Sequence, residues 1–231
     1  MLAKEEKEQL KKKGISEEEF LNQLECFMNG FPILDIVKSA TIGDGIVRLT
    51  PLESEESIER WKNYQEGSGI AEKFVPASGA ASRMFKSLYE YVSNGEVTEF
   101  IKIFFKNIDS FPFRKELDAL CKEKCGGNIR YLYGEGRGQE VIKLLLDPEG
   151  MNFGSLPKGV LPFHTYATEV VKTPFEEHLE ESACYTKNND GIVKLHFTVS
   201  PEHMDLFDNL LQKRQEKYKK ANKISELSVS F

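Results

Sequence analysis

The segment from Val75 to Lys86 combines residue types that suit the binding of an anion. The segment Lys73–Val75 predicts a short buried strand, and the amphipathic stretch at 82–92 predicts a helix. The small residues between them let the main chain approach a ligand closely, and amide groups at a helix start favour negative charge. We therefore predict a loop that binds a nucleotide or phosphate through Ala77, Ser78, Gly79, Ala80, Ala81, Ser82 and Arg83.

Arg83 is the charged residue of this loop. In the first turn of the predicted helix, its guanidinium adds a positive charge suited to bidentate contact with phosphate. The preceding strand places the loop at the carboxyl edge of a sheet, where α/β proteins bind ligands. The alternative is a tight strand-to-helix turn in which Ser82 caps the helix and Arg83 lies on the surface.

Lys158 is the second candidate for chemistry, in the segment Leu156–Pro162 with a proline on either side. A lysine held in this way is well placed, and its point charge can offset charge that develops on a transferring phosphoryl group. Taken alone, a lysine in a proline-bounded loop is more often part of a solvated turn.

Other polar residues give weaker signals. His178 and Glu181 lie three apart on a predicted helix, a spacing that can supply two metal ligands, but a solvated acidic face is favoured. We interpret Asp109 as a helix-terminus residue and the glycine-rich segment 134–138 as a flexible loop. The sequence therefore predicts no metal ligands.

Composition excludes several classes of protein. The formal net charge of −6 argues against a nucleic-acid-binding surface, which needs dense lysine and arginine. No apolar run approaches the roughly 20 residues that span a bilayer, and the charged start at 1–14 lacks the apolar part of a signal peptide. We expect a cytoplasmic protein whose four cysteines are free thiols, and the sequence leaves the oligomeric state open.

The elements predict an α/β fold with more helix than strand. Helices are expected at 4–13, 17–29, 53–65, 82–92, 97–108, 114–124, 139–146 and after Thr173 and Ser200. Strands are expected at 73–75, 183–186, 192–199 and 227–231, with Asn189–Gly191 joining the middle two as a hairpin. Recurrence of strands between helices favours a three-layer arrangement. Residues 1–70 are expected to form a helical cap and residues 71–231 an α/β domain.

The two segments resemble the motifs of sugar nucleotidyltransferases. In that superfamily, Ala-Gly-Gly-x-Gly-Thr-Arg-Leu/Met follows the first strand, and five residues of this chain match: Ala77, Gly79, Ser82, Arg83 and Met84. Ser78 replaces a small Ala or Gly, and Ala81 replaces the second signature glycine. The segment 156–162 resembles the Pro-Lys motif whose lysine contacts phosphates. This resemblance implies a Rossmann-like nucleotide-diphospho-sugar transferase fold, Mg²⁺ as cofactor, and a nucleotide and a sugar phosphate as partners.

The whole chain also resembles the bacterial domain-of-unknown-function family 4301. The segment Val75–Lys86 is the most specific part of this likeness, and His196–His203 is the second. The family is thought to be related to UDP-sugar pyrophosphorylases. Its members are longer, which implies that this sequence is an amino-terminal portion without the metal-binding carboxylate.

Two functional hypotheses follow. In the first, the chain is a sugar-phosphate nucleotidyltransferase or a fragment of one, with Arg83 and Lys158 as catalytic residues. In the second, it is a non-catalytic module that binds a nucleotide or sugar phosphate, or a degenerate interaction domain.

Overall fold

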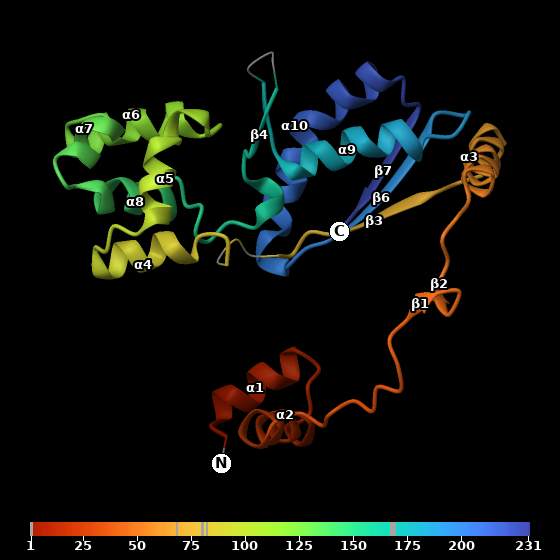
Figure 1. The fold of residues 1–231 in the computed structure, drawn as a ribbon, viewed down its shortest axis with the longest axis horizontal. Coiled ribbons are helices and arrows are strands. Elements are labelled where there is room, and N and C mark those ends of the chain that lie inside the picture. The colour runs from red at the N-terminus through yellow and green to blue at the C-terminus, as the bar shows by residue number, and fades with distance from the viewer. Residues whose placement is uncertain (1, 68, 80, 82, 167–169) are drawn as a thin grey trace. The chain divides into compact units, whose positions relative to one another are not determined.

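The computed structural model describes residues 2–67, 69–79, 81, 83–166 and 170–231 (Figure 1). Contacts divide the chain into two compact units, Met1–Ser54 and Glu55–Phe231. The predicted division at residue 70 stays a prediction. No helix in the described ranges has both the length and the apolar character to cross a membrane.

The first unit contains helices α1 (Lys4–Lys12) and α2 (Glu17–Asn29) and strands β1 (Thr41–Ile42) and β2 (Gly45–Ile46). The Ser16 hydroxyl caps α2 by accepting a hydrogen bond from the Glu19 amide at 3.1 Å. Gly30 ends α2 with a φ of +84°, a conformation that glycine adopts without strain. Both predicted helices are confirmed, and neither buries a side chain.

The second unit begins within helix α3 (Pro51–Glu66), which packs against the end of a later helix. The Trp61 indole donates to the Tyr185 carbonyl at 3.1 Å, and the Gln65 amide group donates to the same oxygen at 2.8 Å. These bonds tie α3 to the C-terminal end of α9 (Pro174–Tyr185).

Three parallel strands form the main sheet, in the order β3-β6-β7 (Figure 1). They are β3 (Glu72–Pro76), β6 (Ile192–Thr198) and β7 (Glu226–Ser230). The strands predicted at 73–75, 192–199 and 227–231 are confirmed, but the burial predicted for 73–75 is wrong except at Val75, because Phe74 lies on the uncovered face of the sheet. Side chains alternate along β6, and those that point to the face covered by α9 and α10 (Met204–Asn222) are buried: Val193, Leu195 and Phe197.

The opposite face of the sheet is half-buried or exposed in the described chain. Phe74 is 63% exposed and stacks on the ring of His196 with centroids 5.4 Å apart.

The predicted α/β class is confirmed as a mixed α/β fold with small parallel sheets. Helices on both faces of the sheet are not seen among the described residues.

The predicted strand at 183–186 is wrong, and so is the hairpin that it implied. Residues up to Tyr185 belong to α9, because Ala183 is buried in the cluster that this helix forms with the sheet. Thr186 ends the helix with its hydroxyl donating to the Ser182 carbonyl at 2.8 Å. The turn at 188–191 instead leads from the helix into β6, which pairs with both neighbours in parallel.

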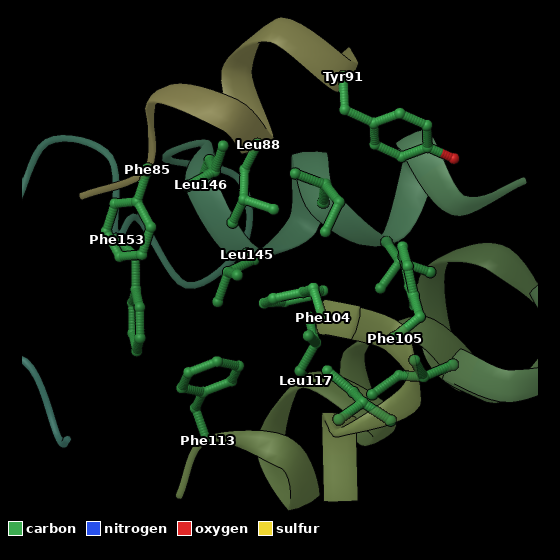
Figure 2. Close-up of a cluster of buried hydrophobic side chains, with 14 of the residues drawn as sticks. Phe85, Leu88, Tyr91, Phe104, Phe105, Phe113, Leu117, Leu145, Leu146 and Phe153 are labelled. Carbon is green, nitrogen blue, oxygen red and sulfur yellow. The ribbon is translucent and has the colours of Figure 1, made fainter. Parts of the chain in front are cut away.

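A helical lobe lies between β3 and α9 in the sequence and has its own core (Figure 2). It contains α4 (Lys86–Asn94), α5 (Glu99–Lys106), α6 (Arg114–Cys125), α7 (Ile129–Gly134) and α8 (Gly138–Leu146). Short elements complete the chain: the 3₁₀ turns η1 (Ile108–Ser110), η2 (Lys158–Val160) and η3 (Pro201–His203), and strands β4 (His164–Thr165) and β5 (Val171–Lys172).

The four cysteines are free thiols, and burial raises the pKa of Cys121 to about 12.

The helix predicted at 82–92 begins later, at Lys86. The amides of Met84 and Phe85 both return to the Ala81 carbonyl, at 2.9 and 3.3 Å, which makes a turn before the helix. Arg83 therefore lies in this turn and not in the first turn of α4, and the loop does not run directly into a helix N-terminus.

Candidate functional site

A cavity of about 190 Å³ lies at the carboxyl ends of β3 and β6. Ala77 and Gly79 of the predicted loop line it, together with Lys158 and Gly159 of η2. In open α/β sheets, ligands bind outside the carboxyl ends of the strands. Two segments singled out separately in the sequence therefore contribute to one cavity.

A main-chain hydrogen bond joins these two segments. The Lys158 amide donates to the Gly79 carbonyl at 3.1 Å, and the Ala77 amide extends the sheet by donating to Thr198 at 2.9 Å. A Cβ atom added at Gly79 meets no atom within 4 Å, so the loop presents open space at this point. Main-chain hydrogen bonds thus hold the segment 77–79 at both ends, and the space beside Gly79 is open.

Gly159 fits closely against α10. A Cβ atom at this position would lie 2.8 Å from Cζ of Phe207 and 2.9 Å from its Cε1. Since Phe207 is fully buried, only glycine lets η2 approach the helix this closely. This packing fixes the position of Lys158, the residue before it.

The start of α9 supplies another wall of the cavity, through Pro174 and Phe175. Thr173 caps this helix as predicted, because its hydroxyl accepts from the Glu176 amide while the Glu176 carboxylate accepts from the Thr173 amide at 2.9 Å. The Arg214 guanidinium also binds the Glu176 carboxylate, at 2.9 Å. The positive end of the α9 dipole therefore lies beside the cavity.

Two polar side chains, Lys158 and His178, line the cavity beside apolar residues. Phe175, Phe197 and Phe207, each at most 1% exposed, form its apolar floor. The Lys158 side chain forms no hydrogen bond or ion pair with any residue in the described part of the chain. A cation beside buried aromatic rings attracts an anion more strongly than one in open water does.

The other predicted loop residues have different environments. Ser78 is exposed, and Ala81 is fully buried with its methyl group in the helical core. Arg83 is exposed and is not among the residues that line the cavity. Ala80 and Ser82 fall outside the described residues. The methyl group of Ala81, where the nucleotidyltransferase pattern has glycine, therefore points away from the cavity.

The family model for "Domain of unknown function (DUF4301)" matches residues 3–231, essentially the whole chain. The chain belongs to this family. No curated protein and no solved structure matches it.

In this DUF4301 chain, His178 also lines the cavity, a place that the sequence did not predict for it. It lies one helical turn after Pro174 on the same face of α9, and this spacing is the signal that places both at the cavity. Its Nδ1 is 3.2 Å from Oε2 of Glu181, and Glu181 also accepts a hydrogen bond from Lys73. The acidic face that we predicted for this helix is therefore partly paired with basic residues.

The Mg²⁺ implied by the resemblance does not fit the described residues at this cavity. Oxygen ligands, mainly carboxylates, hold Mg²⁺ in proteins, and no aspartate or glutamate is among the lining residues. Across the described ranges, no group of three or more His, Cys, Asp or Glu side chains is placed to hold a metal ion. Asp109 instead binds Arg114, at 3.0 Å, and Arg130.

Proposed function

We propose that this DUF4301 chain binds the phosphate group of a nucleotide or sugar phosphate in the cavity around Lys158. The observation that carries the proposal is the hydrogen bond between the Lys158 amide and the Gly79 carbonyl. It brings the small-residue loop and the lysine segment to one place, as joint binding of a phosphate requires.

The size of the cavity supports a phosphate group as the enclosed part of the ligand. Pockets for whole small molecules usually measure about 300–1,000 Å³. A volume of about 190 Å³ is too small for a nucleotide sugar but accommodates a phosphate. The sugar or nucleoside would then extend past the open side of Gly79 and the exposed Ser78.

The parallel order β3-β6-β7 supports a Rossmann-like fold of the nucleotide-diphospho-sugar transferase type as part of this proposal. In such folds the phosphate lies where the loop leaves the first strand. Because β3 is the first strand of the main sheet, we assign this role to the loop that follows it.

Replacement of Lys158 by alanine is expected to weaken the binding of glucose 1-phosphate about 10- to 100-fold. A hydrogen bond to a charged group contributes about 1.5–3 kcal/mol, and each 1.4 kcal/mol is a factor of ten. Isothermal titration calorimetry measures the dissociation constants. Lys220→Ala, an exposed lysine of α10 away from the cavity, is the matched control.

The same calorimetric titration is carried out on Arg83→Ala. Because Arg83 is exposed and lies off the cavity wall, we expect this variant to lose less affinity than Lys158→Ala. Equal affinity of the wild-type and Lys158→Ala proteins for every phosphate tested would reject the cavity as the binding site.

Nucleotidyl transfer is the second candidate, favoured by the meeting of both nucleotidyltransferase-like segments at one cavity. In that reaction an oxygen of the sugar phosphate attacks the α-phosphorus of a nucleoside triphosphate, and pyrophosphate leaves. Lys158 would offset the charge on the transferring or leaving phosphates.

If this second candidate is correct, pyrophosphate is released when the protein is incubated with a nucleoside triphosphate, a sugar 1-phosphate and Mg²⁺. Release should fall at least tenfold in Lys158→Ala, because the lost interaction strengthens in the transition state. Phosphate binding without release from any of the four common triphosphates would favour the non-catalytic binding module.

A further inference from the structure

His178 is held in a defined orientation at the wall of the cavity. The Glu181 carboxylate only accepts hydrogen bonds, so the hydrogen between the two residues is on Nδ1 of His178. The hydrogen bond from Lys73 holds the pKa of Glu181 below its usual range, so the carboxylate stays charged at neutral pH. Nε2 is then the ring nitrogen left for a ligand.

Charged groups of both signs surround His178. Glu181 lies beside it on the same helix, Lys73 pairs with Glu181, and Lys158 lines the same cavity. The surrounding strand β6 and helix α10 contribute only the apolar rings of Phe197 and Phe207 to this wall. A dianion placed between Lys158 and the ring adds negative charge beside His178, and this charge favours the imidazolium.

We propose that His178 takes up a proton when a phosphate monoester binds, so that its Nε2–H donates to the ligand beside Lys158. This inference rests on the proposed function and adds to it a proton-linked contact and a preference for the doubly charged phosphate. The proton comes from solvent, and no covalent bond is made or broken. Histidine suits this role because its ordinary titration, near pH 6.5, lies within the physiological range.

Sulfate is the probe that isolates this effect, because it stays a dianion from pH 5.5 to 8 whereas phosphates titrate there. We expect sulfate to bind about tenfold more tightly at pH 5.5 than at pH 7.5, since binding favours the protonated ring. Calorimetry in two buffers of different ionisation enthalpy should show proton uptake approaching one per sulfate near pH 7.

Three variants test the assignment. His178→Gln should still bind sulfate, weakly, but without the pH dependence and without proton uptake. His164→Gln, whose ring lies off the cavity wall, should behave as wild type. Glu181→Gln should move the pH dependence to lower pH, because it removes the negative charge that favours the imidazolium.

A measurement on the wild-type protein covers the case of a variant that fails to fold. Proton NMR of the histidine rings should show the His178 titration moving to higher pH when sulfate is added. Sulfate and glucose 1-phosphate that bind at no pH would reject the proposed function and this inference together. Binding with the same pH dependence in wild type and His178→Gln would reject the inference and leave phosphate binding intact.

Discussion

Replacement of Phe197 by alanine is expected to lower the free energy of unfolding by about 3–5 kcal/mol. Phe197 is fully buried near the carboxyl end of β6, the central strand of the sheet, and is paired in register with Val75 on β3. Its ring lies 4.7 Å from that of Phe175, measured between centroids. Truncation removes apolar burial and leaves a cavity where the strand, α9 and the floor of the candidate site meet.

Urea unfolding measures this loss. Trp61 is the only tryptophan and bonds to the end of α9, so its fluorescence reports on this part of the molecule. Phe74→Ala is the matched control, because it removes the same ring from the exposed face of the same sheet and should cost less than about 1 kcal/mol. Phe197→Leu should retain most of the stability. Equal losses in Phe197→Ala and Phe74→Ala would contradict the placement of the core.

Replacement of Gly150 by alanine is expected to destabilise the helical lobe by about 2–3 kcal/mol. A Cβ atom there would overlap the Leu144 carbonyl group, whose carbon would be 2.6 Å away, and lie 2.8 Å from the Leu144 Cα. These are main-chain atoms, and the Leu144 carbonyl already accepts a hydrogen bond from the Met151 amide at 2.8 Å. The conflict therefore cannot be relieved by a change of rotamer.

Thermal unfolding followed by circular dichroism tests this prediction. Gly134→Ala is the control, because its added Cβ meets nothing within 4 Å and its position at the end of α7 is helical. Alanine is favoured over glycine in a helix by roughly 0.5–1 kcal/mol, so this variant should unfold at the same or a slightly higher temperature. A Gly150→Ala protein as stable as Gly134→Ala would show that the turn after α8 differs from the one described.

Local signals predicted much of the fold. At Ser16 and Thr173, the side chain caps a helix by accepting a hydrogen bond from the amide three residues ahead. Such caps can be predicted without knowledge of tertiary contacts. The alternation of apolar residues in β6 likewise predicted a strand with one buried face. Such signals failed where they conflict with packing. The segment 183–186 has the composition predicted for a strand, yet Ala183 continues α9 because it is buried against the sheet.

The sequence by itself determined the small-residue loop, the proline-bounded lysine and the strands that surround them, because these depend on residue type and short-range spacing. Only the tertiary structure decided that Gly79 and Lys158 share a hydrogen bond and that His178 lines the same cavity. It also decided that Ala81 belongs to the core and that Arg83 lies off the cavity wall. The physical reason is that contacts between segments far apart in the chain depend on how helices and sheet pack, and no local pattern encodes that arrangement.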